Sequence, residues 1–194
     1  VKAVDANLLD LLKKATQFVV PIYQRVYSWD HSECDQLWKD IIRAGGSDTI
    51  GAHFTGSIVY VEKDQGTIAQ AEPALIIDGQ QRTTTVTLLL AALAAHLDSL
   101  PEAEQEPVVG FAPRKIRGLW LTNEYETGDK YFKLILSQGD KEALKAVVRN
   151  DPLPTGSASR VIANFQFFVS RLKDEATDIV AVCKGISKLV VVDV

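Results

Sequence analysis

Apolar residues recur at helical spacing along the first part of the chain. Leucines and alanines three or four positions apart predict an amphipathic helix over residues 4–15. A second helix is predicted to begin after Asp30, which forms a capping-box pattern with Glu33, and to end at the pair Gly45-Gly46. Its apolar face consists of Cys34, Leu37, Trp38, Ile41 and Ile42. Local periodicity therefore predicts two helices ahead of the first long strand.

Strand-like segments follow a different pattern. Residues 54–62 contain a β-branched and aromatic run and predict a strand. Residues 74–78 are too apolar to have a solvated face, so they predict a central strand, and a leucine-rich helix is predicted over residues 81–97. Residues 18–21 predict a short extended segment, because Pro21 disfavours helix at the residue before it.

The C-terminal half has another order of elements. Acidic, loop-like residues 99–107 suggest a boundary between a unit over residues 1–100 and a second over residues 101–194. The second half predicts strands at 116–121 and 130–136, helices at 141–149 and 159–182, and a buried strand at 188–194. The predicted fold class is α+β, a mixed α/β arrangement of a small sheet with flanking helices and a helical C-terminal part.

Composition narrows the class of protein. A net charge of -4 argues against a surface that grips nucleic acid through charge alone, although it leaves room for a local basic site. Two cysteines make neither a disulfide framework nor a four-ligand metal site, and Cys34 is predicted as a buried thiol. No apolar run reaches the ~18 residues of a membrane span, and no signal peptide pattern is present. We expect a cytoplasmic protein with no membrane partner.

The candidate chemistry is concentrated at the strand-to-helix turn Asp78-Gly79-Gln80-Gln81-Arg82. The first turn of a helix has unpaired backbone N–H groups and the positive end of the helix dipole, so an anion binds there. Gly79 lets a phosphate approach the backbone, and Arg82 reaches the same anion with a planar guanidinium. Asp78, at the end of the strand, is placed to hold Mg²⁺ or to accept a hydrogen bond from a ribose or a water. The carboxamides of Gln80 and Gln81 are suited to orienting water or reading a base.

Thr83 and Thr84 extend the polar stretch and add hydroxyl groups within reach of the same ligand. A purely structural alternative exists, in which Asp78 caps the helix, Gly79 makes the turn and Arg82 lies on the surface. Three adjacent polar residues at a buried junction favour the functional interpretation, since a single cap residue would be enough to begin a helix.

Residues 22–29 form a second cluster, an aromatic loop with one cation. Gln24 and Arg25 would add an amide and a cation to the site if the fold brings this loop to the turn at Gly79. The aromatic candidates for the pocket or for contact with DNA are Tyr23, Tyr27 and Trp29. The alternative is that the rings pack on the core, with Arg25 stacked on one of them.

Four runs of sequence together resemble the N-terminal domain of GmrSD-type modification-dependent restriction proteins. They are residues 21–29, Leu37 with Asp40-Ile41, residues 53–59 and residues 77–85. Their order and spacing match over about residues 18–97, and beyond Leu100 the match is looser. The same stretch is similar, more distantly, to the ParB and sulfiredoxin-like fold, in which a Gly-x-x-Arg motif builds a nucleotide pocket. Here Gly79 and Arg82 satisfy that motif.

The resemblance implies an NTP-binding and NTP-hydrolysing domain of a bacterial antiphage protein that acts on plain or modified DNA through a separate HNH-type nuclease domain. We expect that nuclease domain to follow this chain, which lacks an HNH-like histidine pattern. On the same resemblance, Gly79 and Arg82 hold phosphates, while Gln24 and Arg25 close the pocket from the other loop. The residues implied to position metal or water, and so to serve catalysis, are Asp78, Gln80 and Gln81.

Two other functions remain open. The domain is alternatively a module that senses modified DNA without hydrolysis, in which the aromatic loop encloses the modified group and Arg25 meets a phosphate. A basic strip including Arg114, Lys115 and Arg117 would assist that role. A ParB-like nuclease is the third reading and the weakest, because Asp78 is the one strand-end carboxylate at the turn and a two-metal centre needs more. The preferred base, the DNA modification and the oligomeric state stay open.

Overall fold

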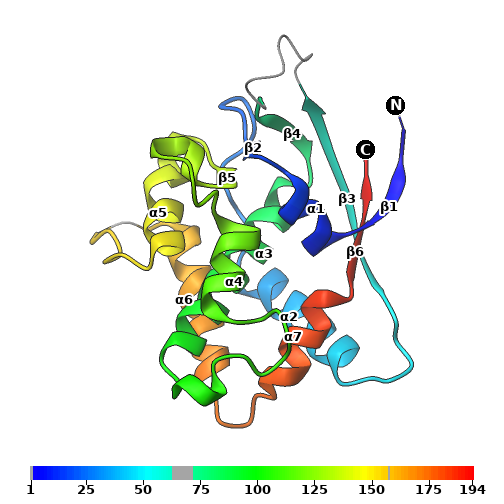
Figure 1. The fold of residues 1–194 in the computed structure, drawn as a ribbon. Helices are drawn as coiled ribbons and strands as arrows, with labels where there is room; N and C mark the ends of the chain where they lie inside the picture. Colours follow the sequence, from blue (N-terminus) through cyan, green and yellow to red (C-terminus); the bar gives the residue numbers. More distant parts are fainter. Residues whose placement is uncertain (1, 63–71, 157) are drawn as a thin grey trace.

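A mixed sheet with helices packed against it forms the core of the molecule (Figure 1). The computed structural model describes residues 2–62, 72–156 and 158–194. Within them the strands are ordered β1-β6-β3-β4-β2-β5. Their bounds are β1 Val4–Asn7, β2 Phe18–Val19, β3 His53–Glu62, β4 Ala74–Asp78, β5 Leu134–Ile135 and β6 Leu189–Asp193. The predicted mixed α/β fold class is confirmed, as are the strands at 54–62, 74–78 and 188–194.

The helices are grouped around one central member. Their bounds are α1 Leu8–Lys14, α2 His31–Gly45, α3 Gln80–Asp98, α4 Pro113–Ile116, α5 Gln138–Arg149, α6 Arg160–Lys173 and α7 Ile179–Ser187. Helix α3 is buried on nearly all sides, with α6 packed along it and α4 against it. Helix α2 packs instead on α7. None of the helices within the described residues is long and apolar enough to span a bilayer.

Strand β3 joins the two ends of the sheet. Its first part pairs in parallel with β6 and its second part pairs antiparallel with β4. The pairing register shifts between Phe54 and Ser57 and again between Val59 and Tyr60. Such bulges re-aim the residues beside them and often occur near functional sites. Gly56 lies in the first irregularity with φ +118°, a backbone conformation that favours glycine.

Helix α2 begins as predicted. Asp30 accepts a hydrogen bond from the first turn while Glu33 reaches back to the N–H of Asp30, which completes the capping box. The thiol of Cys34 is buried on the inner face, as predicted, and burial raises its pKa to about 12. Cys183 is also a free, buried thiol with a pKa raised to about 12 by burial.

The glycine at the end of α2 has a role beyond stopping the helix. Gly45 is still helical, and Gly46 is the C-cap. A Cβ on Gly45 would lie 1.7 Å from the carbonyl oxygen of Ala181, and one on Gly185 would lie 2.0 Å from the carbonyl oxygen of Ile41. Helices α2 and α7 therefore cross with their backbones in contact, which only glycine permits at these two positions.

The predicted helix over residues 4–15 is wrong in its first turn. Val4–Asn7 forms β1, antiparallel to β6, and Asn7 then caps α1 through a hydrogen bond accepted from the N–H of Asp10. Residues 4–7 pair with a strand at the far end of the chain, and this pairing overrides the local helical spacing. The sequence of residues 4–15 alone contains no signal of that partner.

The strand pair predicted for residues 116–121 and 130–136 is largely wrong. Residues 113–116 form α4, and Arg117–Leu121 continues as a π-helical turn. The two segments are joined by an isolated antiparallel bridge between Thr122 and Phe132. Leu134–Ile135 pairs with β2 instead. The apolar residues of this segment face inward at helical spacing, which a short run does not distinguish from a buried strand.

The single helix predicted over residues 159–182 is two helices, α6 and α7. They are separated by the polar residues 174–178, where Asp178 caps α7 by accepting a hydrogen bond from the N–H of Ala181. Strand β4 is central, between β3 and β2, as predicted, although its last two residues, Ile77 and Asp78, are exposed. Strands β5 and β6, from the second half of the chain, lie in the same sheet as those of the first half.

Candidate functional site

A pocket of about 500 Å³ lies where β4 passes into α3. Its lining consists of Gln24, Arg25, Trp29, Gly56, Ser57, Ile77, Asp78, Gly79, Gln80, Gln81 and Arg82. The strand-to-helix turn and the aromatic loop are far apart in sequence, and the fold brings them to one cavity. The first bulge of β3 forms a third wall.

The N-terminus of α3 opens on this pocket. Gly79 is the N-cap, with φ +89° and no side chain that caps the helix. The first backbone bond of the helix is donated by Thr83 to the Gly79 carbonyl at 3.0 Å. The N–H groups of Gln80, Gln81 and Arg82 therefore precede the intrahelical ladder. Unpaired N–H groups of this kind, together with the helix dipole, favour an anion at a helix N-terminus.

Gly79 is also required by the packing of the turn. A Cβ at this position would lie 2.6 Å from the Ser57 carbonyl oxygen and 3.1 Å from the Cα of Ile58. Any other L-residue would add the strain of a left-handed backbone to that clash. Because Gly79 has no side chain, the junction can pack against β3 and its backbone stays accessible.

Arg82 lies over the bulge of β3. Its Nη1 donates to the Ser57 carbonyl at 3.1 Å. A Cβ on Gly56 would lie 2.6 Å from the guanidinium carbon, so Gly56 leaves the space that Arg82 occupies. Burial lowers the pKa of Arg82, and the charge of Asp78 opposes this shift. An arginine pKa starts so high that the side chain remains a cation at neutral pH.

Asp78 is the carboxylate of the pocket, and it is exposed at the end of β4. Among the described residues no group of three or more histidine, cysteine, aspartate or glutamate side chains could hold a metal ion. A lone carboxylate still fits Mg²⁺, which keeps several waters and takes further ligands from substrate phosphates. Asp78 is therefore the residue that would hold Mg²⁺ beside a nucleotide.

The two glutamines of the turn have different surroundings. The Oε1 of Gln81 accepts from the backbone N–H of Ser28 at 2.8 Å and of Trp29 at 3.2 Å. Its Nε2 donates to the carbonyl of Val26 at 3.2 Å. Both ends of this buried carboxamide are therefore engaged by the aromatic loop. Gln80 is also buried and lines the pocket, and the described residues make no such bonds to its side chain.

The loop carries its own polar groups into the pocket. The Nε2 of Gln24 donates to the Ile77 carbonyl at 3.1 Å and so ties the loop to the end of β4. Arg25 is exposed and lines the pocket, so it adds a second cation to a lining that also includes Arg82. Trp29 is half-buried and supplies an aromatic wall.

The predicted threonines do not reach the pocket. Thr83 and Thr84 are buried, and neither contributes to the lining. The hydroxyl of Thr83 donates to the carbonyl of Gly79 at 2.9 Å, one turn back along the helix. The hydroxyl of Thr85 donates in the same way to Gln81 at 2.8 Å. A threonine hydroxyl can donate its hydrogen bond to a carbonyl of its own helix. A threonine in the sequence therefore does not reveal whether its side chain points into the pocket or into the core.

The two tyrosines of the loop also lie outside the lining. Tyr27 is buried, its hydroxyl is 2.7 Å from that of Thr85, and it accepts a bond from Asn164 at 2.8 Å. Burial raises the pKa of Tyr27 above its usual value. Tyr23 is 71% exposed. Packing on the core therefore describes Tyr27, whereas Tyr23 is open to solvent.

Sequence reasoning missed several residues that build the pocket. Gly56 and Ser57 belong to β3, and a glycine inside an otherwise regular strand is a known sign of a bulge. That signal was present and identifies the position. Asn164, which contacts the loop from α6, gave no such signal, because an isolated polar residue in an apolar helix has many explanations.

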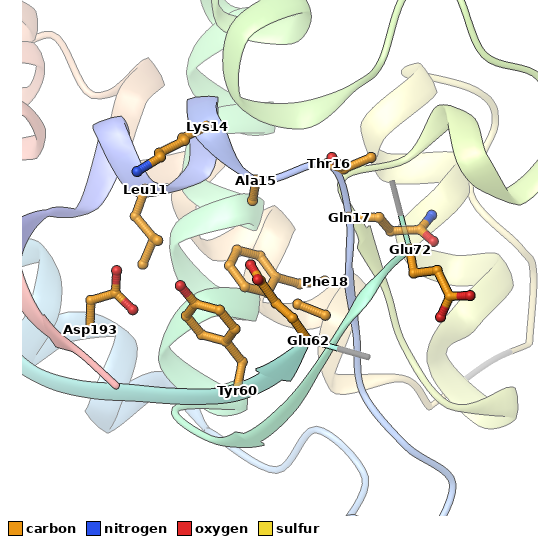
Figure 2. A pocket seen from close by; sticks show the side chains of 11 residues that line it. Leu11, Lys14, Ala15, Thr16, Gln17, Phe18, Tyr60, Glu62, Glu72 and Asp193 are labelled. Carbon is orange, nitrogen blue, oxygen red and sulfur yellow. The ribbon is translucent and has the colours of Figure 1, made fainter. Parts of the chain in front are cut away.

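A second cavity, of about 180 Å³, lies between α1, β2 and the ends of β3 and β6 (Figure 2). Its walls include the carboxylates of Glu62, Glu72 and Asp193. The pKa of Tyr60 beside them is raised to about 12, first by burial and then by the adjacent Asp193. Lys14 also lines this cavity, so three carboxylates and one cation border it, and it suits a phosphate less well than the turn between β4 and α3 does.

The fold and the pocket define an α/β domain with a polar pocket at the strand-to-helix turn between β4 and α3. A family model described as GmrSD restriction endonuclease, N-terminal domain, matches residues 8–188. The match spans most of the chain, and the chain belongs to this family of restriction-endonuclease-associated domains. It extends well past residues 18–97, over which the motifs are most specific. The comparison with curated proteins finds no match.

Proposed function

We propose that this domain binds a nucleoside triphosphate in the pocket between β4 and α3 and hydrolyses it as the regulatory part of an antiphage restriction protein. The observation that supports the proposal is the convergence of three anion-binding groups on one pocket. They are the open N-terminus of α3, the partly buried guanidinium of Arg82 and the exposed cation of Arg25. A ligand with several negative charges in a row matches this arrangement better than a single small anion does.

The phosphates would lie on the first turn of α3. The N–H groups of Gln80 and Gln81 and the free guanidinium nitrogens of Arg82 would bind successive phosphate oxygens. Arg25 would meet the ligand from the loop, and Trp29 offers a face for a ring. Mg²⁺ bound near Asp78 would neutralise charge on the phosphate oxygens.

Hydrolysis needs a water aligned with the terminal phosphorus, and Gln80 is the residue best suited to orient it. Its carboxamide lines the pocket, while that of Gln81 is engaged by the loop. Positioning and charge stabilisation supply most of the catalysis in phosphoryl transfer, so an amide that orients water is a sufficient catalytic group. We therefore assign the water-orienting role to Gln80.

The family gives the domain its context. Membership in a restriction endonuclease family supports DNA as the substrate of the full-length protein, with cleavage carried out by a separate nuclease domain. The domain would act in the cytoplasm, where phage DNA enters. Nucleotide turnover would then gate cleavage, and the present chain would contribute regulation.

Calorimetric titration with ATP, GTP, CTP and UTP in the presence of Mg²⁺ tests the proposal. The wild-type domain should bind at least one of them, and Arg82→Ala should lose about 10- to 100-fold in affinity, as expected for a charge-assisted hydrogen bond. Arg160→Ala, which removes an exposed arginine on α6, is the matched control and should bind normally. Equal affinity in wild type and Arg82→Ala, with both proteins folded, would contradict the site.

A second candidate function, the sensing of modified DNA without hydrolysis, rests on a different observation. Ile22, Tyr23 and Val26 are 83%, 71% and 59% exposed on the loop that borders the pocket. An exposed aromatic and apolar rim beside Arg25 suits an extrahelical modified base. Modified and plain duplexes compared at two salt concentrations would separate this role from charge attraction. A preference for modified DNA that Tyr23→Ala removes supports sensing, and equal, salt-sensitive binding opposes it.

A further inference from the structure

We infer that Asn164 of α6 is a positioning residue for the pocket, acting with Gln81 as a clamp that holds residues 26–29 from two sides. The clamp sets the position of Arg25 and Trp29, the two loop residues that supply a cation and a ring to the ligand. The inference rests on the proposed function, because the ligand in question is the nucleoside triphosphate.

One side of the clamp is the turn itself. The carboxamide of Gln81 accepts from two successive N–H groups, those of Ser28 and Trp29, and donates to the carbonyl of Val26. Three backbone groups of one short loop thus bond to a single side chain, at 2.8, 3.2 and 3.2 Å. These residues form no helix or strand, so side chains supply the partners that secondary structure would give.

The other side of the clamp comes from the C-terminal helices. The Nδ2 of Asn164 donates to the carbonyl of Trp29 at 2.8 Å and to the hydroxyl of Tyr27 at 2.8 Å. Asn164 is 1% exposed. The N–H of Tyr27 donates to the carboxylate of Asp140, at the start of α5, at 3.1 Å. The loop is therefore bonded to three helices, to α3 through Gln81, to α5 through Asp140 and to α6 through Asn164.

This arrangement is more than a satisfied core polar group. A buried polar side chain costs free energy unless it is bonded, and an apolar residue would fill the same space without that cost. A fully bonded network favours a single loop conformation, since each alternative position leaves buried groups unpaired. Asn164 lies outside the lining of the pocket, so any effect of Asn164 on the ligand passes through the loop.

Backbone amide hydrogen exchange without nucleotide tests the clamp. In Asn164→Ala the amides of Ser28 and Trp29, which bond to Gln81, should exchange faster by at least about tenfold. Asn164 accepts no hydrogen bond from those two amides. If the substitution removed only the bonds of Asn164 itself, the exchange rates of these amides would stay unchanged. Tyr27→Phe keeps the ring and removes one Asn164 partner, so it should act in the same direction if Asn164→Ala is too unstable to study. Gln166→Ala, an exposed amide on the same helix, is the control.

Nucleotide titration of the same proteins tests the positioning role. Asn164→Ala and Gln81→Ala should each weaken binding by about tenfold, and the double variant should lose little more, because both act through one loop. Arg82→Ala should weaken binding without faster exchange at residues 26–29.

The two arms separate the possible failures. A folded Asn164→Ala protein with unchanged exchange at Ser28 and Trp29 overturns the clamp. Faster exchange with unchanged affinity, or additive losses in the double variant, overturns the positioning role. If the wild-type domain binds none of the nucleotides, the proposed function fails, and the exchange results still decide whether the clamp exists.

Discussion

Single glycines set the geometry of this pocket as much as its charged side chains do. A Cβ on Gly56 would meet the Arg82 guanidinium at 2.6 Å, and one on Gly79 would meet the Ser57 carbonyl at 2.6 Å. Arg82 can therefore lie against the bulge of β3 only because Gly56 has no side chain. The backbone there also has a positive φ of +118°, so glycine is favoured twice over.

Gly56→Ala should weaken nucleotide binding mainly by displacing Arg82. The new methyl group would occupy the space of the guanidinium, and we expect a loss of about tenfold in affinity, together with a loss of stability from the strained backbone. Calorimetric titration and thermal unfolding measure the two effects. Gly51→Ala is the control, because a Cβ there has no neighbour within 4 Å. An unchanged affinity in folded Gly56→Ala would show that the position of Arg82 does not matter for the ligand.

His96, near the end of α3, should make stability depend on pH. Burial, and then the nearby charge of Lys173, lower the pKa of this imidazole below its ordinary value of 6.5. The unfolded chain then binds the proton more tightly, so the free energy of unfolding should fall as pH drops below about 6.5. Urea unfolding at pH 7.5 and pH 5.5 measures this loss, which should be smaller in His96→Gln. An equal loss in the variant would mean that other groups carry the dependence.

At the scale of elements, the sequence predicted those whose signals are local. Helix α2 carries a capping box and an apolar stripe, and β4 ends at Asp78, with Gly79 directly before the leucine-rich helix α3. The candidate turn follows from the same local signals. Strand β1 has its partner at the other end of the chain, so periodicity alone suggests a helix there. Residues 116–121 were ambiguous because a short apolar run suits either a strand or a helical turn.

The crossing of α2 and α7 should not tolerate a methyl group. A Cβ on Gly185 would lie 2.0 Å from the backbone oxygen of Ile41, so Gly185→Ala must separate the two helices. We expect a loss of at least about 3 kcal/mol in the free energy of unfolding, or failure to fold, as for severe overpacking. Gly139→Ala, within α5 and with no neighbour within 4 Å of its Cβ, should be neutral or slightly stabilising. Equal melting temperatures for both variants would contradict the close crossing.

At the scale of the whole molecule, the candidate site is made by the meeting of three distant segments. One pocket is lined by the turn at residues 78–82, the loop at residues 22–29 and the bulge of β3. Helices α5 and α6 form hydrogen bonds to the loop. The sequence predicted the first two as separate clusters and left open whether the fold would join them. It gave no sign of Asn164, because tertiary contacts between a loop and a helix more than a hundred residues later have no local pattern.

Binding of phosphates on the first turn of α3 is tested most directly by a ¹H–¹⁵N NMR titration of the domain with the tightest-binding nucleotide and Mg²⁺. The amides of Gln80, Gln81 and Arg82 should show the largest saturable shifts, because their N–H groups would donate to the phosphates. Unchanged signals from these three amides, with large shifts elsewhere, such as around the acidic cavity beside Tyr60, would contradict it.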